Sequence, residues 1–144
     1  LLDKLAVKLG GCENHRIGLF DMFLIKDNHI AASGGITVAV NSCKDYRKRI
    51  NADYKIEVEV TNLEQLKEAL DADVDVIMLD NFSVELMKEA VGIVQGRCIL
   101  EASGGINLHN VKSIAETGVD YISIGALTHS VKALDISLNI KPIN

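Results

Sequence analysis

Short apolar runs rich in β-branched residues recur along the chain, and each is followed by polar residues and then by apolar residues at helical spacing. The runs cover residues 22–25, 56–60, 74–79, 98–100 and 121–124. Strands that alternate with helices pair in parallel through right-handed crossovers. The pattern therefore predicts an α/β fold of about five strand–helix units around a parallel sheet.

Polar residues close these runs at a nearly constant interval. Glu59, Asp80, Glu101 and Gly125 are separated by 21, 21 and 24 residues, which is the length of one strand and one helix. A doubly wound sheet and part of a (β/α) barrel both fit parallel strands covered by helices. We favour a partial (β/α) barrel, because polar residues at the same end of every strand are expected where all loops converge on one mouth.

Local signals set the expected helix boundaries. The chain begins on a segment that reads as the end of a helix, and Gly10-Gly11 would stop it. Thr61 and Glu64 have the spacing of a capping box, and Ser83 and Asn107 are expected N-caps of later helices. Residues 37–50 form a poorer helical pattern with a basic end. Residues 1–144 are expected to form a single barrel segment.

The composition excludes some functions. A formal net charge of −5 argues against general binding to nucleic acid or to an anionic membrane. The three cysteines match no zinc or redox spacing, so a reduced, cytoplasmic setting is expected. The apolar runs are too short for a membrane span or a signal peptide.

A cationic cluster stands out in this acidic chain. His15 and Arg16 lie shortly before the first predicted strand, and Lys26 follows it directly. Arginine can hold a carboxylate through two hydrogen bonds, and lysine acts as a point charge, so the expected ligand is an anion. The alternative is a solvated surface turn. His29 and His109 are weaker candidates, and His109 is expected to lie exposed in a helix.

An acidic set is expected at the mouth of the sheet. Glu57 and Glu59 share one face of their strand because side chains alternate, and Asp80 ends the next run. Glu59 and Asp80 could bind Mg²⁺, accept hydrogen bonds from sugar hydroxyls or stabilise a developing positive charge. A salt bridge to Lys26 is the alternative.

Two glycine turns follow the last two predicted strands. They are Ser103-Gly104-Gly105 and Gly125-Ala126, each expected to lead into a helix. Glycine allows backbone N–H groups to approach a phosphate closely, and turns of this kind after the last strands of a (β/α) barrel often bind phosphate. Simple turn geometry is the alternative, and residues 128–130 could only cap the last helix.

Several motifs resemble quinolinate phosphoribosyltransferase, also called nicotinate-nucleotide pyrophosphorylase (carboxylating). The resemblance covers nearly the whole chain, in family order. The matching segments are GGCENHRIGLFD (10–21), LIKDNH (24–29), EVEV (57–60), MLDNF (78–82), LEASGGI (100–106) and GVDYISIGALTHS (118–130).

The resemblance implies a pentosyltransferase of NAD biosynthesis. It would convert quinolinate and phosphoribosyl pyrophosphate into nicotinate mononucleotide, pyrophosphate and CO₂, with Mg²⁺. It places His15, Arg16 and Lys26 on the quinolinate carboxylates and Glu59 and Asp80 near the ribose and the metal. The 5′-phosphate positions implied are Ser103, Gly104, Gly125 and Ala126. Lys26, Glu59 and Asp80 would be the catalytic residues.

By the same resemblance, this chain corresponds to the C-terminal barrel portion. The family's N-terminal α/β domain and first barrel strand would be absent, and the intact enzyme would be a homodimer or larger. We therefore expect the 144-residue chain alone to have negligible activity.

Two other functions fit parts of the pattern. The first is a different enzyme on a phosphate-binding barrel, such as an isomerase or synthase acting on a phosphorylated sugar or an indole precursor. The second is a truncated, non-catalytic barrel segment, whose exposed strand edges would favour self-association.

Overall fold

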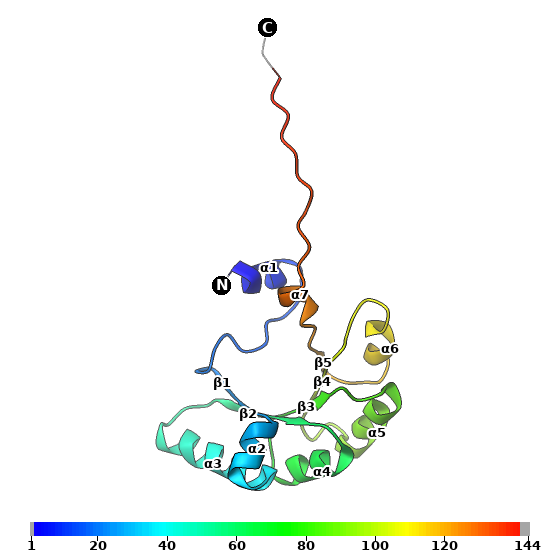
Figure 1. The fold of residues 1–144 in the computed structure, drawn as a ribbon. Coiled ribbons are helices and arrows are strands. Elements are labelled where there is room, and N and C mark those ends of the chain that lie inside the picture. Colours follow the sequence, from blue (N-terminus) through cyan, green and yellow to red (C-terminus); the bar gives the residue numbers. More distant parts are fainter. Residues whose placement is uncertain (1, 142–144) are drawn as a thin grey trace.

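A curved sheet of five parallel strands forms the centre of the computed structural model, which describes residues 2–141 (Figure 1). The strands are β1 (Met22–Ile25), β2 (Lys55–Val60), β3 (Val76–Asp80), β4 (Ile99–Ser103) and β5 (Tyr121–Ile122). Their spatial order is β1-β2-β3-β4-β5, so each strand pairs with the next one along the chain. This order has no reversal point, as a doubly wound sheet would need, and it agrees with the expected portion of a (β/α) barrel.

Helices cover the outer face of this sheet. They are α2 (Asp27–Ser33), α3 (Ile36–Arg49), α4 (Leu63–Asp71), α5 (Val84–Val94) and α6 (Val111–Ala115). Two more helices, α1 (Leu2–Leu9) and α7 (Ala126–His129), lie together on the opposite, concave side (Figure 1). The chain between α1 and β1 therefore passes along the concave side of the sheet.

The two faces of the strands have different side chains. Val58, Ile77 and Leu100 point toward the helices and belong to the main hydrophobic core. Met78 is also buried but lies outside that core and lines the concave side. Alternation along a strand thus separates an apolar packing layer from a concave layer that also contains Glu57.

Two aspartates fix the register at the amino ends of the strands. Asp75 accepts a hydrogen bond from the Ile56 N–H at 2.8 Å, and its own N–H donates to the Ile56 carbonyl. Asp120 makes the same pair of bonds with Leu100. Each aspartate precedes its strand by one residue and so joins two neighbouring strands.

Several element boundaries differ from the sequence expectations. β4 continues to Ser103, so Glu101 lies within the strand and Ser103 closes it, whereas β5 stops at Ile122. Helix α2 was not expected, because its seven residues carry too short an apolar pattern. His29 lies in its first turn, where its Nδ1 accepts a hydrogen bond from the Lys26 N–H.

Two expected helix caps were wrong. Asn62, not Thr61, is the N-cap of α4 and accepts a hydrogen bond from the Gln65 N–H, so the capping-box expectation was off by one residue. Helix α6 begins only at Val111, after a turn that contains His109, and Asn107 is not its N-cap. Ser83 does cap α5, as expected.

Residues 131–141 leave the body of the molecule as an extended arm whose apolar side chains are exposed (Figure 1). Among residues 2–141, none of the helices has the length and apolar character that a membrane crossing would need.

We predict that Ile77→Ala lowers the free energy of unfolding by about 2–5 kcal/mol, because it opens a cavity in the core. The side chain of Ile77 is 0% exposed, whereas that of Ile140 is 86% exposed. Ile140→Ala is the matched control and should change the free energy by less than about 0.5 kcal/mol. Urea unfolding followed by circular dichroism measures both, and equal effects would contradict the described core.

Candidate functional site

A cleft of about 630 Å³ opens at the carboxyl ends of the strands, on the concave side of the sheet. Eight of the nine residues singled out from the sequence line it. They are His15, Lys26, Glu59, Asp80, Ser103, Gly104, Gly125 and Ala126. Arg16 lines an adjoining cleft of about 720 Å³, which shares His15, Ser123 and Gly125 with the first. The fold thus gathers side chains from distant parts of the sequence around one space.

Lys26 and Glu59 form an ion pair across neighbouring strands. Lys26 Nζ lies 2.6 Å from Glu59 Oε2, and the two side chains are 44% and 15% exposed. The salt bridge considered as an alternative from the sequence is therefore present. An ammonium has three donors, so Lys26 can hold Glu59 and still present N–H groups to a ligand in the cleft.

Asp80 is held by its neighbour Asn81, a residue that the sequence analysis did not single out. Asn81 Nδ2 donates to Asp80 Oδ2 at 3.0 Å, and the Asn81 backbone N–H donates to the Ser103 carbonyl at 2.9 Å. Asn81 has a φ of 55°, in the left-handed region that asparagine tolerates better than most residues. The sequence did contain a signal for this role, because an asparagine directly follows the aspartate that closes the strand. Asn81 links the carboxylate of β3 to the end of β4.

The first glycine turn has a geometry that requires glycine. Gly104 and Gly105 have φ values of 93° and 62°, and a Cβ on Gly104 would collide with the Asn81 amide. The turn does not lead directly into a helix, because α6 begins only at Val111, so the expectation of an adjacent helix N-terminus was wrong here. Gly125 has an ordinary φ of −61° and precedes α7 directly.

The glycine turns leave donors unused. Among the residues that the structure describes, the backbone N–H groups of Gly104, Gly105, Gly125 and Ala126 donate to no protein acceptor. All four residues line the cleft of Lys26. Backbone N–H groups that converge on one space favour an anion such as phosphate.

Helix α1 holds the segment that carries His15 and Arg16. Lys4 Nζ donates to the carbonyls of His15 and Arg16, at 3.1 and 2.5 Å. Asn14 Nδ2 donates to the Lys4 carbonyl at 3.0 Å. Asp21 closes the following turn by accepting from the Ile17 N–H at 2.6 Å, and this bond is the main reason why the pKa of Asp21 is lowered.

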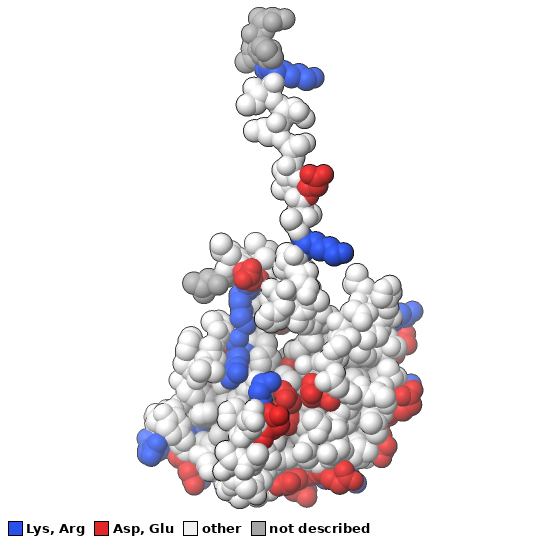
Figure 2. All heavy atoms as spheres, viewed as in Figure 1, with Lys and Arg blue, Asp and Glu red and all other residues white. Residues whose placement is uncertain are grey.

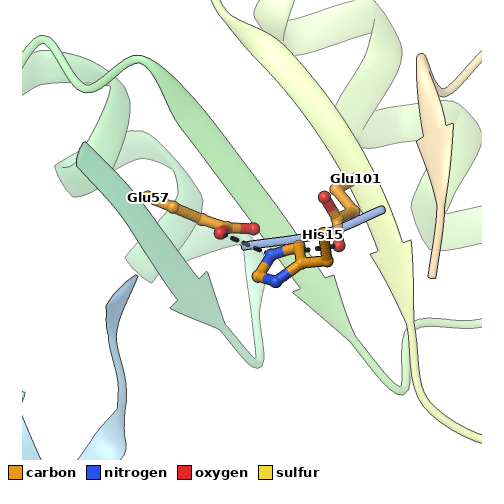
Figure 3. A group of neighbouring side chains, drawn as sticks. All are labelled: His15, Glu57 and Glu101. Atoms are coloured by element: carbon orange, nitrogen blue, oxygen red, sulfur yellow. Dashed lines mark hydrogen bonds and ion pairs between the residues drawn. The ribbon is translucent and has the colours of Figure 1, made fainter. Parts of the chain in front are cut away.

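His15 reaches between two buried carboxylates in the middle of the sheet (Figure 3). Its Nε2 lies 2.9 Å from Glu57 Oε2 and 3.8 Å from Glu101 Oε1. The hydrogen bond to Glu57 raises the pKa of His15 above its usual range, against an opposing effect of burial. Burial raises the pKa of Glu101, while a hydrogen bond donated by the Ser123 hydroxyl lowers it.

The partners of His15 were only partly foreseen. Glu57 was expected on the same strand face as Glu59, and Glu101 at the end of a later strand, but nothing in the sequence links either of them to His15. Figure 2 shows Lys, Arg, Asp and Glu side chains near one another around the hollow between the sheet and the α1 side.

Two arrangements have the chemistry of metal ligands. Among the described residues, His15, Glu57 and Glu101 have ligand atoms within 4.8 Å of one another. Glu59 and Asp80 line the same cleft, but Glu59 is already paired with Lys26. Asp80 is partly exposed, so it can contribute a carboxylate oxygen to an ion that keeps most of its waters.

Comparison with known proteins gives a consistent result. A family model described as "Quinolinate phosphoribosyl transferase, C-terminal domain" matches residues 1–139. A chloroplastic nicotinate-nucleotide pyrophosphorylase (carboxylating) of Arabidopsis thaliana is 50% identical over 97% of the chain and 44% of its own length. A mitochondrial quinolinate phosphoribosyltransferase (decarboxylating) of Nicotiana tabacum is 48% identical over the same shares. The chain spans less than half the length of these curated relatives.

Solved structures that match this chain also include nicotinate-nucleotide pyrophosphorylases. The nicotinate-nucleotide pyrophosphorylase of Francisella tularensis matches with a TM-score of 0.86 and 50% identity, over 92% of this chain and 46% of that one. The protein of the same name from Ehrlichia chaffeensis matches with a TM-score of 0.88 and 47% identity, over 98% of this chain and 50% of that one. Mandelate oxidase, at 20% identity and a TM-score of 0.52, shares the fold alone.

We predict that Gly104→Ala destabilises the chain by about 1–3 kcal/mol, because alanine is strained at this φ and its Cβ meets Asn81. Gly92→Ala is the control, since Gly92 lies within helix α5 with open space around it. That substitution should stabilise the chain by about 0.5–1 kcal/mol. Urea unfolding should give opposite signs for the two variants, and the same sign for both would contradict the turn geometry.

We predict that His15 keeps its proton to a pH above its ordinary pKa of 6.5 and that Glu57→Gln lowers its pKa again. Stability from the charged pair is then fully present below pH 6.5 and is lost as the pH rises through the raised pKa. NMR titration of the His15 ring in the presence of a chelator measures this, with exposed His109 as the internal control. A His15 pKa that is the same in both proteins would rule out the charge pair.

Proposed function

The chain belongs to the quinolinate phosphoribosyltransferase family, and we propose that it forms the part of such an enzyme that binds both substrates. The reaction joins quinolinate to phosphoribosyl pyrophosphate and yields nicotinate mononucleotide, pyrophosphate and CO₂. The single observation that supports this most is the grouping of a lysine, two carboxylates and two glycine turns around one cleft. The proposal includes a role in NAD biosynthesis, since the names of the relatives include nicotinate nucleotide and quinolinate.

We assign the recognition of the quinolinate carboxylates to Lys26, Arg16 and His15. Lys26 stands at the cleft with its ammonium half exposed, and Glu59 limits the positions that the ammonium can take. Arg16 lines the adjoining cleft, where its guanidinium can donate two hydrogen bonds to a carboxylate. A ligand held at both points is oriented as well as bound, so much of the rate gain would come from positioning.

We assign the ribose side to Glu59 and Asp80. The transfer builds positive charge at the anomeric carbon as pyrophosphate leaves, and nearby carboxylates stabilise such charge. Asp80 would be the main ligand of Mg²⁺, with Glu59 as the second carboxylate. When bound, Mg²⁺ would neutralise negative charge on the pyrophosphate that departs. Asn81 donates a hydrogen bond to Asp80 Oδ2, and the other carboxylate oxygen of Asp80 would bind the ion.

We assign the 5′-phosphate to the two glycine turns. The backbone N–H groups of Gly104, Gly105, Gly125 and Ala126, which have no acceptor among the described residues, supply donors, and Ser103 adds a hydroxyl in the same cleft. Glycine has no side chain of its own that could keep a phosphate oxygen away from these N–H groups. At Gly104 the space that a Cβ would need is filled by the Asn81 amide.

The wider setting is also a proposal. We propose a cytoplasmic location, with which three unpaired cysteines agree. We also propose a homodimer or larger assembly that contains the remaining family segments. Because the chain spans 44% of the length of its relatives, binding is a more direct test of its own residues than turnover.

We predict that Lys26→Ala weakens the binding of quinolinate at least tenfold, or about 1.4 kcal/mol, while phosphoribosyl pyrophosphate is affected less than threefold. Asp80→Ala should show the reverse pattern when Mg²⁺ is present. Isothermal titration calorimetry on the 144-residue chain measures both ligands. Lys112→Ala and Glu116→Ala, two exposed positions of helix α6 and its end, are the matched controls.

Equal effects of Lys26→Ala and Asp80→Ala on both ligands would overturn this division of roles. If quinolinate leaves the melting temperature unchanged while a simple sugar phosphate raises it strongly, the cleft instead serves a different phosphate-binding enzyme activity.

A further inference from the structure

An excess of negative charge is buried where His15, Glu57 and Glu101 meet. The side chain of Glu57 is 0% exposed and that of Glu101 is 8% exposed. Glu57 Oε1 is fully buried and has no hydrogen-bond partner among the described residues. Burial of a carboxylate oxygen without a partner destabilises the fold, because the oxygen loses its hydrogen bonds to water and forms no new hydrogen bond.

The nearby basic groups do not balance this charge. Even a protonated His15 supplies one positive charge against two carboxylates. Lys26 is paired with Glu59, and Lys4 donates to backbone carbonyls. Arg16 lines the same cleft but forms no ion pair among the residues that the structure describes. Among the residues that the structure describes, His15 is therefore the one basic side chain within ion-pair distance of Glu57 and Glu101.

We propose that His15, Glu57 and Glu101 form a binding site for a divalent transition-metal ion of the Zn²⁺ class. The three ligand atoms lie within 4.8 Å of one another, and His15 Nε2 lies 2.9 and 3.8 Å from the two carboxylates. A tetrahedral ion with bonds of about 2.0–2.1 Å sets its ligand atoms roughly 3.3 Å apart. His15 Nε2 lies closer than this to Glu57 Oε2 and farther than this from Glu101 Oε1, so the side chains would adjust when an ion binds.

The donor set points to zinc rather than magnesium. One imidazole nitrogen and two carboxylate oxygens are ligands that Zn²⁺ binds readily, whereas Mg²⁺ prefers oxygen ligands and keeps several waters. Two carboxylates, a neutral imidazole and a divalent ion sum to zero charge, which removes the imbalance. A fourth position would remain open toward the cleft that Arg16 lines.

The surroundings hold these ligands in place. Glu57 and Glu101 lie within strands β2 and β4, on either side of β3 (Figure 3). The Ser123 hydroxyl donates a hydrogen bond to Glu101. Lys4 anchors the backbone at His15. Hydrogen bonds of this kind orient metal ligands and strengthen binding.

This site shares His15 with the proposed quinolinate site, but its carboxylates differ from the proposed magnesium pair, Glu59 and Asp80. Its test uses no substrate and so does not depend on the proposed enzymatic activity. Glu59 is two residues further along the same strand as Glu57 and also faces the concave side. It therefore provides a matched control that separates the two sites.

The test is a calorimetric titration of the chelator-treated 144-residue chain with ZnCl₂, without substrates. We expect one equivalent to bind and the melting temperature to rise. Glu57→Gln and Glu101→Gln should each weaken binding at least tenfold, and Glu59→Gln should change it less than threefold. MgCl₂ should not compete at the concentration of ZnCl₂ used.

Cysteine must be excluded as the ligand. Burial raises the pKa of the Cys98 thiol, to about 11, and also that of Cys43, so both stay protonated, but Cys12 is exposed. Co²⁺ should therefore give a tetrahedral visible spectrum without a thiolate charge-transfer band, and Cys12→Ser should leave this spectrum unchanged.

Three results would overturn the proposal: no stoichiometric Zn²⁺ binding, equal affinity in the three glutamate variants, or a thiolate band that Cys12→Ser abolishes. If Glu57→Gln fails to fold, NMR of the unmodified chain decides. Zn²⁺ should shift the ring signals of His15 and leave those of exposed His109 in place, and the opposite pattern would refute the site.

Discussion

The alternation of side chains along parallel strands is the constraint on which the rest of this structure depends. On β2, Ile56, Val58 and Val60 face the helices, while Glu57 and Glu59 face the concave side. The apolar layer supplies the packing that stabilises the sheet. That stability lets the other layer hold buried carboxylates, which would be too costly in a loop. A shift of register by one residue would exchange the two layers and destroy both.

Charge pairing organises the concave layer at two depths. At the carboxyl ends of the strands, Lys26 neutralises Glu59 and keeps its ammonium half exposed beside the glycine turns. Deeper in the sheet, His15 pairs with Glu57 and approaches Glu101. The outer level is suited to reversible ligand binding, because its side chains are still partly exposed to solvent. At the inner level the two carboxylates are buried, so the balance of charge around them has a large energetic effect.

The sequence predicted the strand–helix alternation well, because buried parallel strands are continuous apolar runs. It also placed eight of nine candidate residues around one cleft, since strand ends are easy to locate in such runs. Contacts made by loops could not be predicted. The partners of His15 depend on how residues 12–21 pass along the concave side, and the role of Asn81 depends on one backbone angle. Helix α2 was not predicted, because its seven residues are too few to show a helical pattern of apolar residues.

The central claim is that the carboxyl ends of these strands bind one phosphorylated ligand together. An NMR titration of the ¹⁵N-labelled chain with nicotinate mononucleotide tests it most directly. The account predicts that the largest amide shifts fall on Gly104, Gly105, Gly125 and Ala126, whose N–H groups have no protein acceptor among the described residues. Shifts centred on Asp75 and the other residues at the amino ends of the strands would contradict it.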